Sequence, residues 1–195
     1  MKNDTRQLLA EALMRLLQVK PINKITVIEL TEESNFSRMT FYYYFQDIYD
    51  LVIWIFEENA KDILEKNGGV SNWPQSLKEL LQLGLRNKNI IMNIYRYMSP
   101  AQVEQYLTGF VEPNIESCIR GRAAGIPISE NGLKSIITFY SHILVGAVVD
   151  WVNQGMSANI SQLVNLISTT IRSRLIPSIQ SISQLEQNID SPTLE

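Results

Sequence analysis

Apolar residues recur about every 3.6 positions along the whole chain, and this pattern restricts the fold more than any other feature of the sequence. No stretch alternates apolar and polar residues with period two for long, so strands are not needed. The 195 residues, 45% of them hydrophobic, are enough for one large or two small packed units. We therefore predict an all-α fold of about nine helices.

The first helix is predicted over residues 5–19, because Leu and other apolar residues follow helical spacing there and Lys20-Pro21 ends the pattern. A second helix starts after Thr26. The Thr26 hydroxyl can accept the backbone N–H of Glu29 while the Glu29 carboxylate reaches back, which makes a capping box. These signals predict two helices within the first 35 residues.

Ser34-Asn35-Phe36 interrupts the second helix, and Ser37 is again an N-cap residue. A third helix is predicted over residues 38–44, with Phe41 and Phe45 facing the core. Two short helices joined by a tight turn are typical of a helix-turn-helix, whose second helix enters the major groove of DNA. We therefore predict a DNA-reading unit within residues 26–45.

The side chains of the third helix suit contact with DNA. Hydroxyls and one guanidinium can reach phosphates and base edges. They come from Ser37, Arg38, Thr40, Tyr42, Tyr43 and Tyr44. The aromatic run at residues 41–45 goes around the whole helix, so some tyrosine hydroxyls must face solvent or a ligand. A packing cluster in a helical protein without DNA is the alternative that the pattern alone leaves open.

The net charge is low for a protein that binds DNA. The chain carries a formal charge of -3, and its first 50 residues have six basic and seven acidic side chains. Non-specific binding to the phosphate backbone depends on cations. Any contact with DNA must therefore rest on the local placement of few of them.

Further helices follow in the rest of the chain. A long amphipathic helix begins after Asp47 and ends at Asn67-Gly68-Gly69. The last helix carries apolar residues from 160 to 175 and is expected to end before Pro177. We divide the chain into a helix-turn-helix unit at 1–46, a second helical unit at 47–180, and a polar, frayed tail at 181–195.

The segment from Ile25 to Leu51, ITVIELTEESNFSRMTFYYYFQDIYDL, resembles the signature of the TetR family of bacterial regulators. That signature reads roughly I-T-V-x-x-I-A-x-x-A-G-V-S-x-G-T-x-Y-x-x-F-x-x-K-x-x-L. The likeness covers the N-terminal quarter strongly, and the rest through helix number and length. It implies three DNA-binding helices followed by six helices for ligand binding and dimerisation.

The resemblance implies a role in DNA binding for one set of residues: Thr26, Ser37, Arg38, Met39, Thr40, Tyr42, Tyr43 and Tyr44. Thr26 and Tyr42 would hold phosphates, while Arg38 and Thr40 would approach base edges. The last two tyrosines would contact the DNA backbone or thymine methyl groups. Ser37 would cap the reading helix.

Four departures from the family signature involve five residues. Leu30-Thr31 replaces Ile-Ala, and Asn35 replaces the turn glycine. Met39 replaces a small residue, and Ile48 replaces a lysine that touches phosphate in the family. Asn35 is compatible with the turn, because asparagine adopts the left-handed conformation more readily than most residues. The loss of the lysine is expected to weaken DNA binding and to lower its salt dependence by about one unit of slope.

The segment from Phe139 to Met156, FYSHILVGAVVDWVNQGM, resembles a dimer-forming helix in a TetR-like branch that includes regulators of dihydroxyacetone kinase operons. Gly146-Ala147 permits close approach of helices, and two strongly apolar helices suit a four-helix dimer interface. The predicted interface residues are Tyr140, Leu144, Ala147, Val148, Trp151, Leu163, Ile167 and Ile171. Two interior helices of a monomer are the open alternative.

An effector pocket is expected among the later helices. Its candidates are Trp54, Tyr95, Tyr97, Phe110, Phe139 and His142, and each of them could equally be a core residue. A pH-sensing role for His142 is an alternative to a hydrogen-bonded position in the core or in an interface.

The favoured function is a bacterial, cytoplasmic, homodimeric repressor that binds double-stranded DNA at a near-palindromic operator and answers to a small-molecule effector. A co-regulator or protein-interaction module with weakened or lost DNA binding is the alternative. No enzyme is expected, because nucleophile-elbow, phosphate-loop and zinc-protease motifs are missing from the sequence. No metal or other cofactor is expected either, since Cys118 and His142 are the only Cys and His. Contact with a membrane is not expected, because the strongly apolar uncharged run at 135–149 is shorter than the ~20 residues that span a bilayer.

Overall fold

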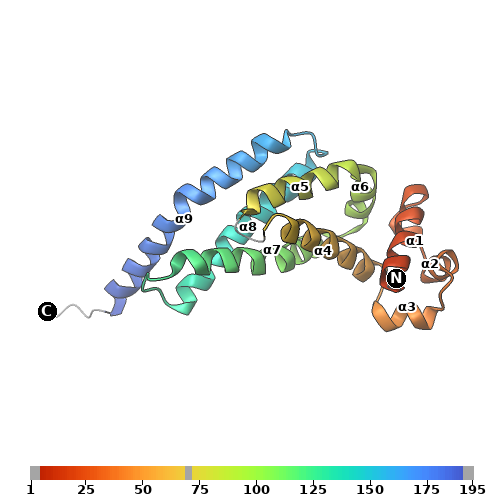
Figure 1. Ribbon diagram of the computed structural model, residues 1–195, viewed down its shortest axis with the longest axis horizontal. Helices are drawn as coiled ribbons and strands as arrows, with labels where there is room; N and C mark the ends of the chain where they lie inside the picture. Colours follow the sequence, from red (N-terminus) through yellow and green to blue (C-terminus); the bar gives the residue numbers. More distant parts are fainter. Residues whose placement is uncertain (1–4, 69–71, 191–195) are drawn as a thin grey trace.

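The computed structural model describes residues 5–68 and 72–190. Its helices are α1 (Thr5–Val19), η1 (a short 3-10 helix, Ile22–Lys24), α2 (Val27–Ser34), α3 (Arg38–Tyr44), α4 (Ile48–Lys66), α5 (Trp73–Arg86), α6 (Lys88–Tyr97), α7 (Pro100–Ala123), α8 (Glu130–Asn153) and α9 (Ile160–Asp190). Figure 1 shows an elongated molecule, with α1, α2 and α3 at one end and α9 extending toward the other. The predicted all-α class and number of α-helices are confirmed for the described residues.

The capping motifs of the sequence set the starts of α2 and α3. Thr26 Oγ1 accepts the backbone N–H of Glu29 at 3.2 Å, and Glu29 Oε2 accepts the backbone N–H of Thr26 at 3.0 Å. Ser37 Oγ accepts the backbone N–H of Thr40 at 3.0 Å. Between the helices, Asn35 has φ 57° and ψ 34°, the left-handed conformation of a tight turn. Both predicted caps and the turn are therefore confirmed.

The core beneath the helix-turn-helix extends beyond the first three α-helices. Phe41 and Phe45 are buried on the inner side of α3, as predicted. The same cluster takes in Leu51 from the first turns of α4, and Ile90 and Ile94 from α6. Residues of α4 and α6 therefore complete the core of the N-terminal helices, and the division of the chain at residue 46 stays a prediction.

A second core lies among α5, α7, α8 and α9. The central helix, α8, packs against α7 and α9 and buries Ile136, Tyr140 and Leu144. By length and composition alone α8 could span a membrane. However, 44% of its most apolar 18-residue segment is buried inside the protein. Its apolar character matches that of a helix packed between two neighbours.

The last helix, α9, continues through Pro177, which corrects two expectations: that the helix ends before Pro177 and that a frayed tail begins at residue 181, since residues 181–190 are helical. A proline inside a helix removes one backbone hydrogen bond. Packing beyond the proline offsets this loss, because Ile179 is fully buried and the Ser183 hydroxyl donates to the carbonyl of Pro127 at 2.5 Å. The last five residues of the predicted tail lie outside the described residues.

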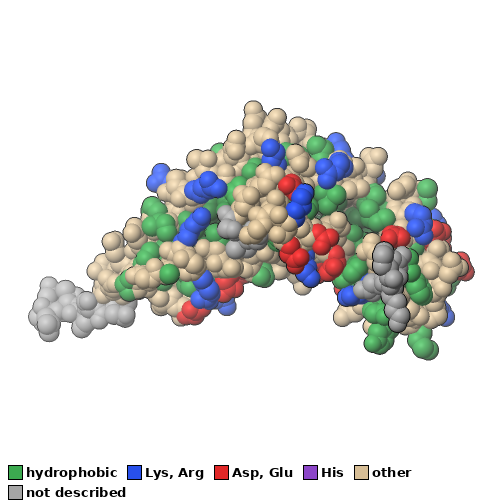
Figure 2. All heavy atoms as spheres, in the orientation of Figure 1, with side chains coloured by type: hydrophobic (Ala, Val, Ile, Leu, Met, Phe, Trp, Pro, Cys, Tyr) green, Lys and Arg blue, Asp and Glu red, His purple; other side chains and the backbone are tan. Residues whose placement is uncertain are grey.

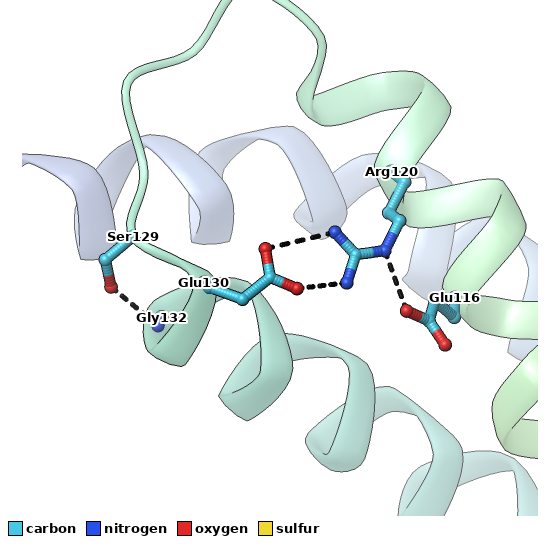
Figure 3. A network of polar contacts seen from close by, with 5 residues as sticks. All are labelled: Glu116, Arg120, Ser129, Glu130 and Gly132. Atoms are coloured by element: carbon cyan, nitrogen blue, oxygen red, sulfur yellow. Dashed lines mark hydrogen bonds and ion pairs between the residues drawn. The ribbon is translucent and has the colours of Figure 1, made fainter.

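Polar contacts hold the start of α8 to its neighbours. Arg120 of α7 donates to Glu116 at 2.7 Å and through two further nitrogens to Glu130 (Figure 3). Ser129 caps α8, and Glu186 of α9 accepts the N–H and the hydroxyl of Ser129 at 2.8 and 2.5 Å. Arg120 lowers the pKa of Glu130, and the bonds from Ser129 lower the pKa of Glu186. Charged hydrogen bonds thus join α7, α8 and α9 at this end.

Candidate functional site

The outer side of α3 presents large side chains to solvent. Met39 is 83% exposed and Tyr43 is 80% exposed, with Tyr42 and Tyr44 also exposed. Figure 2 shows hydrophobic side chains, a class that there includes Met and Tyr, projecting from the end of the molecule where α3 lies. Since Phe41 anchors the opposite side of α3 in the core, the exposed side chains stand on a fixed helix and are available to a partner.

Three of the residues predicted to contact DNA have hydroxyls that form hydrogen bonds at the start of α2 or α3. Thr26 Oγ1 lies 3.3 Å from Glu29 Oε2, to which it can donate. The hydroxyls of Ser37 and Thr40 lie 2.9 Å apart. The structure therefore shows Thr26 and Ser37 as caps and the Thr40 hydroxyl beside that of Ser37, and the contact of all three residues with DNA stays a prediction. All eight predicted residues lie on α3 or at the N-terminus of α2 or α3.

Ion pairs reduce the positive charge near α3. Arg15 Nε lies 2.7 Å from Glu33 Oε1, and Lys20 Nζ lies 2.6 Å from Glu29 Oε1. The hydrogen bond from Lys20 is the largest cause of the lowered pKa of Glu29. Arg38 is exposed, and among the described residues no carboxylate pairs with it. Arg38 is thus the cation that α3 itself can offer to a phosphate or a base.

The start of α4 offers carboxylates where the family signature has a lysine. Ile48, at the position of that lysine, is buried in the N-terminal core. Asp47 caps α4 by accepting the N–H of Asp50 at 2.9 Å, and Asp50 accepts the N–H of Gln46 at 2.9 Å. This part of the surface therefore adds no attraction for phosphate.

A cavity of about 340 Å³ lies among α4, α5, α6, α7, α8 and α9. Its volume is in the range of small-molecule sites, which runs from about 300 to 1,000 Å³. Its wall is almost entirely apolar and includes Trp73, Leu77, Ile91, Phe110 and Trp151. The cavity is therefore a candidate ligand site.

Of the six predicted pocket residues, Tyr95 and Phe110 line this cavity. The other four do not, and the prediction is corrected for them. Trp54 packs against Phe45 in the N-terminal core, with ring centres 5.9 Å apart. Tyr97, Phe139 and His142 are exposed on the surface. Helical spacing identified long helices with aromatic residues but could not tell which side of each helix faces the cavity.

The predicted dimer residues are mostly core residues of the single chain. Tyr140, Leu144, Trp151, Ile167 and Ile171 are each less than 9% exposed, so their side chains offer almost no area to a second copy. The prediction is corrected for these five, whereas Ala147, Val148 and Leu163 are half-buried. Among the described side chains, the most exposed apolar ones of α8 and α9 are instead Phe139, Leu166 and Leu185.

Sequence reasoning missed Asn93, which joins α6 to the N-terminal helices. Its Oδ1 accepts the backbone N–H of Ile22 at 3.0 Å, and its Nδ2 donates to the carbonyls of Leu17 and Lys20 at 3.2 and 3.0 Å. One amide side chain thus satisfies three backbone groups where α1 ends. The available signal was a polar residue inside the apolar stripe of α6.

Comparison with known families identifies the chain. The family model of the TetR-type transcriptional regulator C-terminal region (TetR_C_8) matches residues 71–173, more than half of the sequence. The chain belongs to the TetR family of transcriptional regulators. This match lies outside the helix-turn-helix, so it supports the family independently of the N-terminal signature.

Relatives of known name include other TetR-type regulators. The HTH-type dhaKLM operon transcriptional activator DhaS of Lactococcus lactis subsp. lactis (strain IL1403) is 29% identical over 91 residues, which are 47% of this chain. The matched segment spans about half, 49%, of the relative's length. The predicted likeness to regulators of dihydroxyacetone kinase operons is therefore confirmed at the level of resemblance.

Solved structures of TetR-type regulators share the fold. A dihydroxyacetone kinase operon activator, DhaS, superposes with a TM-score of 0.62 at 22% identity, covering 86% of this chain and 96% of its own. The fatty acid degradation regulator FadR from Bacillus halodurans gives 0.53 at 15% identity, covering 90% and 96%. The repressor AlkX from Dietzia sp. strain DQ12-45-1b, implicated in biodegradation of n-alkanes, gives 0.53 at 14% identity, covering 92% and 100%.

Proposed function

We propose that this TetR-family regulator acts in the bacterial cytoplasm as a homodimer that binds double-stranded DNA through α3. A small molecule bound in the cavity controls this DNA binding. The observation that carries the proposal is the placement of α3. Its inner side is held by Phe41 and Phe45, its start is capped by Ser37, and its outer side exposes Arg38 and three tyrosines. A rigid, exposed second helix of a helix-turn-helix fits the major groove.

The direction of control is a separate part of the proposal. From the sequence we predicted repression. The named relative from Lactococcus lactis is an activator, which supports activation at a neighbouring operon for this chain. A reporter fusion to the adjacent transcription units, in cells with and without the regulator, distinguishes the two: expression falls on deletion of an activator and rises on deletion of a repressor.

We place the dimer surface on the exposed side of α8 and α9. Phe139 is 60% exposed on α8, and Leu166 is 68% exposed on α9. A Cβ built at Gly146 on α8 would meet no atom within 4 Å, so a neighbouring helix could approach closely there. Two such helices from each copy would form a four-helix interface and bury these side chains.

Ligand and DNA would be linked through α4 and α6. Val52 of α4 and Ile94 of α6 belong to the N-terminal core and also line the cavity. On another side of α6, Asn93 holds the backbone at the end of α1. A ligand that favours one position of α6 would therefore favour one position of the helix-turn-helix, which is the differential contact that allosteric control requires.

The proposal is tested by selection of bound duplexes from a random DNA pool, followed by binding titrations at several salt concentrations. We expect an enriched near-palindrome whose half-sites lie about one helical turn or a multiple of it apart, with affinity that falls as salt rises. Absence of salt-dependent binding at micromolar protein in low salt would contradict DNA binding and support the co-regulator alternative.

A further inference from the structure

We propose that the cavity binds an uncharged, mainly apolar molecule. The one polar group of this molecule forms a hydrogen bond with the hydroxyl of Ser76. This inference names the class of effector and so rests on the proposed function. Its basis is the chemistry of the cavity wall. The residues that line the wall come from six helices and are almost all aliphatic, aromatic or methionine.

The wall contains no cation to pair with a negatively charged ligand. Among the described residues that line the cavity, Lys, Arg and His are absent, and Glu57 alone carries a charge. An ionised carboxylate moved from water into such a wall would lose its hydration without gaining a partner. Figure 2 shows further acidic side chains gathered over α4, the helix that carries Glu57. Anionic ligands are therefore disfavoured both at the surface and inside.

A positively charged ligand gains little in compensation. Glu57 is exposed, so an ion pair formed there would remain in water. Exposed ion pairs contribute little to affinity, whereas burial of the attached ammonium in the apolar interior is costly. The balance of these two effects favours a neutral molecule.

The polar groups of the wall are mostly already bonded. The hydroxyl of Tyr95 donates to Asn153 at 2.7 Å, and the hydroxyls of Tyr140 and Ser178 lie 3.0 Å apart. Ser76 on α5 differs, because its buried hydroxyl has no hydrogen-bond partner in the described part of the chain. A buried polar group without a partner is unfavourable, so a ligand that supplies one gains affinity.

Access to Ser76 requires side chains to move. Ser76 is 1% exposed, so neighbouring side chains cover its hydroxyl. Leu80 lies one helical turn further along α5 on the same side and also lines the cavity. A ligand that reaches Ser76 therefore displaces aliphatic side chains such as Leu80. Its own apolar part then replaces the apolar contacts that these side chains made.

The experiment uses three eight-carbon probes, 1-octanol, octanoate and octylammonium, titrated into the full chain without DNA at neutral pH. Trp73 and Trp151 line the cavity, so tryptophan emission reports occupancy, with Trp54 as a constant background elsewhere. We expect 1-octanol to bind at least about ten-fold more tightly than either ion. Equal or tighter binding of either ion, or no binding of 1-octanol up to its solubility, would overturn the inference.

Two variants locate the bound alcohol. Ser76→Ala is expected to weaken 1-octanol by about three- to ten-fold, the effect of one hydrogen bond. The control is Ser141→Ala. The hydroxyl of Ser141 is also buried and has no hydrogen-bond partner among the described residues, but Ser141 does not line the cavity. Equal affinity in wild type and Ser76→Ala would overturn the role of Ser76.

Gly84→Leu serves as the variant that fills the cavity. A Cβ at Gly84 would lie 3.9 Å from Trp151 Cζ3, an ordinary contact, so the larger side chain extends into the space without a backbone clash. We expect loss of the emission change while the protein still unfolds in one cooperative transition at no lower denaturant concentration than wild type. A retained change would show that 1-octanol binds elsewhere and would overturn the inference. DNA binding of the ligand-free protein is measured separately. A failure of the proposed DNA binding can then be distinguished from a failure of the proposed ligand class.

Discussion

The side-chain oxygen of Asn93, on α6, accepts the backbone N–H of Ile22 at 3.0 Å. The side-chain nitrogen of Asn93 donates to the carbonyls of Leu17 and Lys20, so both ends of the amide bond the backbone where α1 ends. Because Ile94, the next residue of α6, lines the cavity and is buried in the N-terminal core, α6 touches both candidate sites. The position of this helix is therefore central to any communication between them.

Replacement of Asn93 by Leu should loosen this connection. The N–H of Ile22 would lose its acceptor, and we expect its hydrogen exchange to accelerate while the free energy of unfolding falls by about 1–3 kcal/mol. Hydrogen exchange by mass spectrometry or NMR measures the first effect, and urea unfolding the second. Asn89→Leu, at an exposed position of the same helix, is the control. Unchanged protection of Ile22 in the Asn93 variant would contradict the connection.

The turn between α2 and α3 should tolerate glycine better than alanine at residue 35. Asn35 has a positive φ, which alanine adopts at a cost of about 1–2 kcal/mol and glycine adopts readily. We expect Asn35→Ala to lower the free energy of unfolding by about 1 kcal/mol relative to Asn35→Gly. Denaturant unfolding of the two variants measures the difference. Equal stability would mean that the turn does not need the left-handed conformation.

Acid should weaken the contact between the end of α9 and the start of α8. Hydrogen bonds from Ser129 lower the pKa of Glu186 below its ordinary value of 4.5, so folding favours the charged carboxylate. The resulting stability is present above that ordinary value and is lost as pH falls through the lower pKa of the folded state. We expect Glu186→Gln to reduce stability at pH 7 and to lose less stability than wild type on acidification below about pH 4.5.

Urea unfolding at pH 7 and at several values below 4.5 measures this pH dependence. Glu65→Gln, which removes an exposed carboxylate from α4, is the control. Parallel pH profiles for wild type and Glu186→Gln would contradict the role assigned to the contact, and with it the packed state of the end of α9.

A charge on the exposed side of α9 should disrupt the proposed dimer. Leu166→Glu places a carboxylate where the interface would be apolar, and an unpaired buried charge is strongly unfavourable. We expect sedimentation at micromolar protein to show monomers for this variant and dimers for wild type. Val19→Glu alters another exposed apolar residue, at the end of α1, and should remain dimeric. A dimeric Leu166→Glu protein would move the interface elsewhere.

Local signals predicted the N-terminal part of the fold well. A cap depends on a hydroxyl and a backbone N–H three residues later, so Thr26 and Ser37 could be recognised from the sequence and are observed as caps. The periodicity of α3 likewise placed Phe41 and Phe45 inside. These features depend on neighbours within one or two helical turns, which is the range over which sequence patterns carry information.

The later features depend on partners distant in the sequence. Periodicity marks Tyr140 and Trp151 as apolar-facing, but it does not say whether the partner is the same chain, a second copy or a ligand. The extension of α9 past Pro177 likewise depends on Ser183 meeting the carbonyl of Pro127, which no local rule predicts. Such contacts become visible only when the helices are assembled.

Arg38 should contact DNA directly, as the cation of the reading helix α3. Fluorescence anisotropy with the selected duplex should show Arg38→Ala binding about 1–3 kcal/mol more weakly than wild type and with less sequence preference. Lys134→Ala, on the distant helix α8, removes the same charge and should bind as wild type does. If Arg38→Ala and Lys134→Ala both keep wild-type affinity and sequence preference, α3 is not the helix that reads DNA.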